Sequence, residues 1–202
     1  MTSKSIKYGI CLNIIITSLL LSGCKSPKPY NKKYYVLNVN RTAETKKPDN
    51  KFILDVRTFT IDSAFDSKSL VYRRDEFEYE TDFYNEFLTS PAIMITEKTR
   101  TWLSNSGIFN LVIDKGAYID PTHTLLANIT ALYADRRQQK AVMEIRAFLV
   151  SNDAPDDSVI MTATYKTSSA LKSQVPEALL EAFDICLTRI LTDMENDLRQ
   201  KL

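Results

Sequence analysis

Histidine and glycine are scarce in this chain, and their scarcity excludes several kinds of catalytic site. The 202 residues include 1 histidine, His123, and 4 glycines, of which only Gly107 and Gly116 lie beyond residue 23. A metal centre built from several histidines cannot form, and two separated glycines cannot make a phosphate-binding or dinucleotide-binding loop. No serine stands in the glycine-flanked turn that carries the hydrolase nucleophile. The sequence therefore predicts no enzyme activity and no cofactor.

A strong charge of either sign is also missing. The chain has 26 Lys and Arg against 25 Asp and Glu, which gives a formal net charge of +1. Nucleic-acid-binding domains carry an excess of basic residues on one face, so nucleic acid is not an expected partner. With 44% hydrophobic and 25% charged residues, the composition is that of a folded globular protein.

Acidic residues do cluster, at positions 75–80 and 153–157. Glu78 and Glu80 share one face of an expected strand, as residues on a solvated strand face do. Positions 153–157 resemble a turn rather than a calcium loop, because the ordered ligands and the central glycine are absent. No spacing favours a paired-carboxylate hydrolase either, so a hydrolase that uses Glu78 and Glu80 is the least favoured function, and no metal is expected.

Residues 1–23 have the parts of a secretory signal. Lys4 and Lys7 precede an apolar run from about Gly9 to Leu21. This run is shorter than the roughly 20 apolar residues that a transmembrane helix needs, so a cleaved export segment is expected.

The end of that run, Leu21-Ser22-Gly23-Cys24, resembles the lipobox of bacterial lipoproteins. The resemblance implies cleavage between Gly23 and Cys24, diacylglycerol on the Cys24 sulfur and acylation of the new amino terminus, so that palmitate should label the protein. Several acyl chains, at about 0.8 kcal/mol per buried methylene, anchor a protein durably in a membrane. The alternative is an ordinary secretory peptide that happens to end beside a cysteine.

Residues 24–33 are expected to form the lipidated amino terminus and a tether. Positions 25–33 contain four lysines and two prolines without an apolar pattern, and nine extended residues reach about 30 Å. A solvated tether is favoured over one whose lysines contact anionic headgroups. Cys186 is then the one remaining free thiol, which excludes an internal disulfide; core packing is favoured over an intermolecular bridge.

Residues 34–202 are expected to form a single α+β domain, in which two helices pack on one face of a mostly antiparallel, mixed sheet. Shorter strands are expected at 34–39, 52–57, 70–73, 77–81 and 108–114, with a hairpin between the third and the fourth. Three alternating runs then predict an antiparallel meander with one buried face. The residues expected on that face are Leu125, Ala127, Ile129, Ala131 and Tyr133, then Met143, Ile145, Ala147 and Leu149, then Val159, Met161, Ala163 and Tyr165.

The two helices have clear start signals. The first begins near Ser90-Pro91 and should stop at Gly107, since a capping residue followed by proline starts helices and glycine ends them. The second runs from Pro176 to about Gln200, with apolar residues at steps of three and four. Packing on the sheet is the favoured role of this apolar stripe, and a groove for a partner is the alternative.

Four segments carry a family resemblance by their order along the chain: Tyr34-Tyr35-Val36-Leu37, residues 66–73, Tyr84-Asn85-Glu86-Phe87 before Ser90-Pro91, and residues 102–109. In this order they resemble the ABC-transport auxiliary lipoproteins, the PqiC-like group associated with MCE-type lipid transporters. Phe87 stands where that family usually has tryptophan. The resemblance covers nearly all of the chain after the tether.

The resemblance implies a lipid-anchored, non-catalytic periplasmic component on the inner leaflet of the outer membrane. It would dock the membrane-distal end of an MCE assembly, whose permease and ATPase lie in the inner membrane. Lys25 favours the outer membrane, because an Asp after the lipidated cysteine would signal inner-membrane retention in enteric bacteria. The alternative is a structural envelope lipoprotein that tethers another assembly and has no transport role.

Aromatic side chains of the expected strands are the candidate surface for a partner or for lipid, since aromatics are enriched in such contacts. They are Tyr72, Tyr79, Phe83, Tyr84 and Phe87. Core packing is the alternative for each. The sequence leaves open whether phospholipid is bound directly and whether the protein forms a homo-oligomer.

Overall fold

The computed structural model describes residues 31–43, 48, 50–114, 116, 118–152 and 158–202. From Lys32 on, the described residues belong to one compact unit, Lys32–Leu202. Its first strand begins at Lys33, the residue at which the expected tether ends. Gly23, Cys24 and the acidic positions 153–157 lie outside the described residues.

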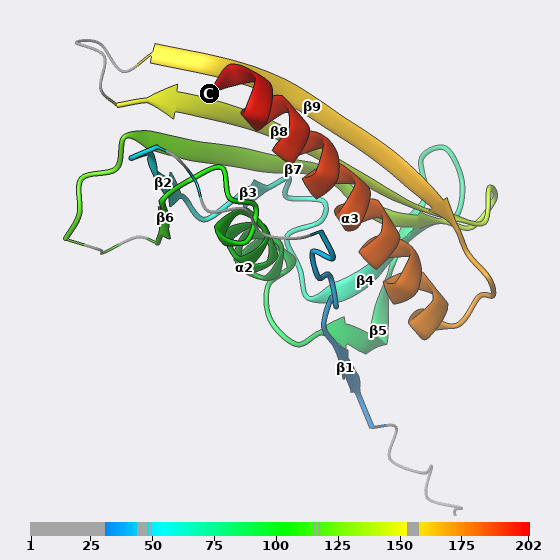
Figure 1. Cartoon of the computed structure of the whole chain (residues 1–202). Coiled ribbons are helices and arrows are strands. Elements are labelled where there is room, and N and C mark those ends of the chain that lie inside the picture. The colour runs from blue at the N-terminus through cyan, green and yellow to red at the C-terminus, as the bar shows by residue number, and fades with distance from the viewer. Residues whose placement is uncertain (1–30, 44–47, 49, 115, 117, 153–157) are drawn as a thin grey trace, which may run out of the picture. The chain divides into compact units, whose positions relative to one another are not determined.

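A mixed sheet and two helices make up the described part of the chain. The strands are β1 (Lys33–Tyr35), β2 (Ile53–Val56), β3 (Thr60–Ile61), β4 (Ser69–Arg73), β5 (Tyr79–Phe87), β6 (Leu111–Ile113), β7 (His123–Asp135), β8 (Lys140–Ser151) and β9 (Ser158–Ala170), and the helices are α2 (Pro91–Ser104) and α3 (Pro176–Lys201). In Figure 1, α3 runs diagonally across β8 and β9, and α2 lies next to it on the same side of the sheet. The expected α+β architecture is confirmed.

The meander is the regular part of the sheet. β8 pairs antiparallel with both β7 and β9 over nearly its whole length, as predicted. The predicted inward face is wrong in two places, because each ladder contains a register shift. The shift between Ile129 and Ala131 turns Leu132 and Ala134 into the core in place of Ala131 and Tyr133. The shift beside Leu149 leaves Val159 58% exposed.

Short strands complete the sheet, and most of their pairings are parallel. β1 pairs with β5, β2 lies between β6 and β7, and β3 and β4 also pair with β7, all in parallel. The predicted hairpin of β4 and β5 is confirmed as an antiparallel pair. The second strand of this hairpin, predicted at 77–81, is Tyr79–Phe87 in the structure. It begins later than predicted because Phe77 lies in the turn, where it is 90% exposed.

The first strand is shorter than the predicted 34–39. After Tyr35 the chain leaves the sheet and passes along the helices, where its backbone finds other partners. The Leu37 amide lies 3.1 Å from the sulfur of Met94 in α2, and the Asn38 amide donates to a carboxylate oxygen of Asp184 in α3 at 2.8 Å. Leu37 and Val39 are buried all the same, so their apolar character reflects packing against helices rather than sheet pairing.

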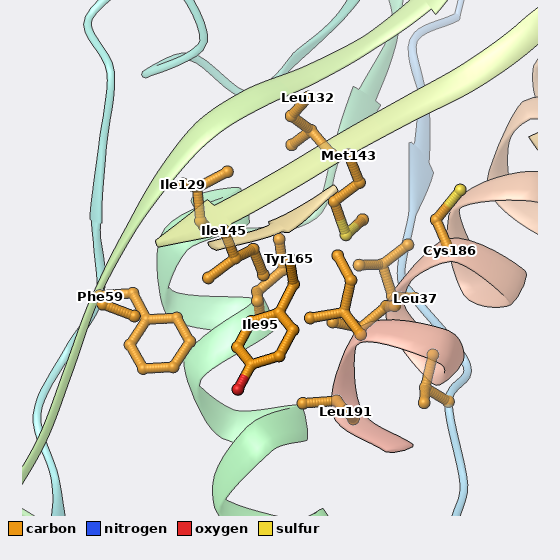
Figure 2. Close-up of a cluster of buried hydrophobic side chains, with 14 of the residues drawn as sticks. Leu37, Phe59, Ile95, Ile129, Leu132, Met143, Ile145, Tyr165, Cys186 and Leu191 are labelled. Atoms are coloured by element: carbon orange, nitrogen blue, oxygen red, sulfur yellow. The ribbon is translucent and has the colours of Figure 1, made fainter. Parts of the chain in front are cut away.

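α3 buries its predicted apolar stripe, and α2 also buries apolar side chains, in one core between the helices and the sheet. Side chains from the chain after β1, from α2, from the meander and from α3 meet there (Figure 2). Cys186 is part of this core and fully buried, and burial raises the pKa of its thiol. Core packing, the favoured interpretation of Cys186, is therefore confirmed. α2 ends at Ser104, shortly before Gly107, whose φ of 70° is a left-handed conformation suited to glycine.

Candidate interaction surfaces

The structure divides the five candidate aromatic residues. Tyr72 and Phe87 are 3% and 2% exposed, so the core-packing alternative holds for these two. Tyr79, Phe83 and Tyr84 are exposed, and Phe83 is the most exposed of them at 67%. Of the five candidates, only these three side chains can take part in a surface contact.

The two buried aromatics have structural partners. The Tyr72 hydroxyl donates to a carboxylate oxygen of Asp82 at 3.2 Å, and the Arg136 guanidinium lies 4.0 Å from the centre of the Tyr72 ring. Burial raises the pKa of Tyr72, so the hydroxyl stays protonated and can donate. Phe87 packs against Phe183 of α3, with ring centres 6.4 Å apart. The Phe87 ring thus fills the space between the sheet and α3.

Tyr79 belongs to an aromatic cluster near the β4–β5 turn. Its ring centre lies 5.6 Å from that of Tyr133 and 6.3 Å from that of Phe65, both in edge-to-face geometry. The Arg73 guanidinium stacks over the Tyr133 ring at 5.1 Å. Tyr133 lies here because the register shift in β7 turns it away from the core. Tyr79 therefore packs against Tyr133 and Phe65 and is 46% exposed.

A bulge in β5 holds Phe83 and Tyr84 out from the sheet. Ser69 of β4 pairs with Glu86, and Val71 pairs with Thr81. Residues 82–85 of β5 therefore lie opposite a single residue of β4, and most of them are looped out of the ladder. One carboxylate oxygen of Asp82 accepts the backbone N–H groups of Tyr84 and Asn85 at 2.9 and 3.0 Å. The two projecting rings meet edge to face with centres 5.1 Å apart. Asp82 thus fixes the pair in place.

Strand β1 extends this pair into a larger surface. Lys32, just before β1, forms an ion pair with Glu86, and its ammonium group lies 4.6 Å from the centre of the Phe83 ring. Leu88 donates its backbone N–H to Tyr35 at 2.8 Å, which places it beside β1. We call the exposed apolar residues of this edge the β1–β5 edge surface: Tyr34, Val36, Phe83, Tyr84 and Leu88. Sequence patterns missed Tyr34, Val36 and Leu88, because alternation along a strand does not show which strand lies at a sheet edge.

Tyr35 fastens this edge to the rest of the fold. Its hydroxyl lies 3.1 Å from the side-chain oxygen of Asn85 and 3.0 Å from a carboxylate oxygen of Glu177. Burial and the neighbouring Glu177 carboxylate raise the pKa of Tyr35 to about 12. Glu177 lies in the first turn of α3, where its negative charge also complements the helix dipole. β1 is therefore held against both β5 and α3.

A second polar cluster joins the chain after β1 to both helices. Glu195 of α3 accepts hydrogen bonds from Arg41 Nε at 2.9 Å, from Trp102 Nε1 at 2.8 Å and from Arg199 at 2.8 Å. Burial opposes the charge on Glu195, but these donors outweigh it and hold the pKa of the carboxyl below its ordinary range. These contacts of the Glu195 carboxylate join the chain after β1, α2 and α3 to one another.

The described residues offer no assembled catalytic or metal centre. No group of three or more metal-ligating side chains occurs among them. Glu80 pairs with Arg74 at 2.7 Å, as residues on a solvated strand do, and the His123 ring packs edge to face against Phe52 with centres 5.0 Å apart. None of the described helices is both long and apolar enough to cross a membrane.

Comparison with known families supplies what this geometry does not. A family model described as the ABC-type transport auxiliary lipoprotein component matches residues 35–195, most of the chain. The chain belongs to this family. This confirms the resemblance seen in the sequence motifs. As an ABC-type transport auxiliary lipoprotein, the protein is a transport accessory associated with the cell envelope, and its family is not one of known enzymes.

Solved structures share the fold at low sequence identity. The Xanthomonas campestris protein XCC0632, of the family model DUF330, has a TM-score of 0.70 and 19% identity over 80% of this chain and 92% of its own. An uncharacterised protein has a TM-score of 0.67 and 10% identity over 83% and 99% of the two chains. The hypothetical protein CT253 from Chlamydia trachomatis has a TM-score of 0.55 and 9% identity over 74% and 98%. The search of curated proteins found no match.

Proposed function

We propose that this auxiliary lipoprotein is a lipid-anchored, non-catalytic component of an MCE/ABC-type system that moves lipid or other hydrophobic molecules between membranes. The observation that carries the proposal is the family match over residues 35–195. It is preceded in the sequence by a segment, residues 21–24, that resembles a lipobox. The protein would act by position: it holds a partner at a membrane and makes or breaks no bond.

The proposed location is the periplasmic side of the outer membrane. Lipid on Cys24 would anchor the chain. The next residue is Lys25 and not the aspartate that signals inner-membrane retention in enteric bacteria. The partner would be an MCE-family protein together with its permease and ATPase. The exposed Tyr79, Phe83 and Tyr84 are the proposed contact residues for partner or lipid.

Structural features of the described residues support a non-catalytic role. Glu195 and Asp135, two of the three buried carboxylates among the described residues, are held by arginine and backbone donors. The third, Asp55, forms an ion pair with Arg57 through one of its two oxygens. A general acid or base needs a group that is free to exchange a proton with a substrate. The ion pairs described here instead join strands and helices.

Affinity purification from crosslinked cells tests the proposal. The lipidated protein should recover an MCE protein, its permease and its ATPase. A Cys24→Ser variant, which cannot form the thioether, should lose both palmitate labelling and this recovery, although its folded domain is unchanged. If lipidated protein recovers other envelope components but no MCE or permease subunit, the protein is a structural tether and the transport role is wrong.

A further inference from the structure

We propose that the β1–β5 edge surface is a membrane contact: it lies in the headgroup region of the bilayer that holds the lipid anchor. This inference rests on the proposed lipidation of Cys24. It adds a second point of attachment, made by the folded domain itself, and thereby a fixed orientation of the domain on the membrane.

The composition of the surface suits a membrane interface. Its five residues are between 42% and 67% exposed, and all of them are aromatic or branched aliphatic. Grouped exposed apolar residues mark contact sites, and tyrosine in particular is enriched where membrane meets water. Lys32 and Lys68 border the surface, where ammonium groups can meet lipid phosphates.

The short sequence separation between Cys24 and this surface favours a bilayer over a protein partner. Lys32, whose ammonium group lies over the Phe83 ring, is eight residues after Cys24. Eight residues span about 29 Å at full extension, so a lipidated Cys24 cannot leave this surface far from the bilayer. Tethering raises the local concentration of one binding site near another, so even a weak contact is occupied for much of the time.

The surface is also preformed. Asp82 holds the backbone of Tyr84 and Asn85, and Tyr35 fastens β1 to α3, so little ordering is needed on contact. Figure 1 shows that β1 and the start of β9 lie at opposite ends of the fold. Contact through the edge surface would therefore direct the β8–β9 end away from the membrane, towards the periplasm and a partner.

Tryptophan fluorescence of the full-length lipidated protein tests the contact. Phe83→Trp is compared with Val159→Trp, a position of similar exposure at the opposite end of the fold. Both variants are placed in vesicles of phosphatidylethanolamine and phosphatidylglycerol with brominated acyl chains, and the constant emission of Trp102 is subtracted. Phe83→Trp should be quenched at least about twofold more than Val159→Trp, as expected for a side chain at the headgroup–acyl boundary.

Equal quenching of the two variants would overturn the proposal, and so would a shielded Phe83→Trp that bromine does not quench, which would mean a second copy or a protein partner on the surface. Tyr84→Trp repeats the measurement should Phe83→Trp fail to fold. Palmitate labelling of the same samples separates the causes of failure. Without label the proposed lipoprotein function fails and this inference with it, whereas label without selective quenching overturns the membrane contact alone.

Discussion

The two ends of the sheet differ in almost every physical respect. The meander of β7, β8 and β9 has long antiparallel ladders whose inner residues pack against α3. The β1–β5 end has a three-residue edge strand, a bulge in β5 and exposed aromatic rings. Apolar residues that are buried stabilise the fold, whereas a group of exposed apolar residues marks a contact site. We therefore place folding stability in the meander and contact in the edge.

The largest effect is expected from a cavity in the stable half. Leu187 of α3 is fully buried, so Leu187→Ala removes packing that neighbouring side chains can replace only in part. It should lower the free energy of unfolding by about 4 kcal/mol. Urea denaturation of the purified protein measures this. Val159→Ala in the exposed start of β9 is the control, and an equal loss in both variants would contradict the assignment of stability to the core.

Glu195→Ala should cost somewhat less, about 3 kcal/mol, because it removes the carboxylate that accepts hydrogen bonds from Arg41 Nε and from the Trp102 N–H. The matched control is Glu181→Ala on the same helix, which breaks only the exposed pair with Lys172 and should cost less than about 1 kcal/mol. Both are measured by urea denaturation. If the two variants are equally stable, the Glu195 cluster does not join the chain after β1 to the helices.

Acid should weaken the ion pairs and hydrogen bonds of the Glu195 and Asp135 carboxylates. The pKa of Glu195 and of Asp135 is held below the ordinary range by their donors, despite burial, so both carboxyls bind fewer protons when folded than when unfolded. The stability that they contribute is complete above the unfolded pKa of about 4 and is lost as pH falls through the lower folded pKa. Asp184 acts in the opposite direction, because burial raises its pKa.

The urea concentration at the unfolding midpoint should therefore decrease as the pH is lowered from 5 to 2. The decrease should be less steep in Glu195→Gln. A midpoint that is flat over this range would show that these ion pairs do not stabilise the fold.

The smallest effect on stability is expected at the edge surface. Phe83→Ser and Tyr84→Ser remove exposed rings and should change the free energy of unfolding by about 0.5 kcal/mol or less. In the lipidated protein the double variant should nevertheless orient less uniformly on vesicles, which polarised infrared spectroscopy of supported bilayers can detect. A large loss of stability would mean that these rings belong to the core.

Sequence patterns predicted the regular half of the molecule well. The three meander strands, both helices and the hairpin follow from alternation, helical spacing and capping residues, since each of these signals is local. The faces of Tyr133 and Val159 were predicted wrongly, because a register shift changes which side chains point inward without changing the alternation before it.

The edge surface could be predicted only in part. Phe83 and Tyr84 were among the candidates because they are aromatic, but their exposure depends on the bulge held by Asp82, and a bulge has no reliable local pattern. Tyr72 and Phe87 look the same in the sequence and are buried. Which strand lies at the edge follows from pairings between distant segments, such as β1 with β5.

The burial of Cys186 has a practical consequence. A chain cleaved before a lipidated Cys24 would keep this sulfur as its one thiol, and the core shields it from reagents. A cysteine introduced at any exposed position would then be the single reactive handle of the native molecule. Maleimide spin labels or dyes could be attached one site at a time without first removing a native residue, which makes the depth and tilt of the domain directly measurable.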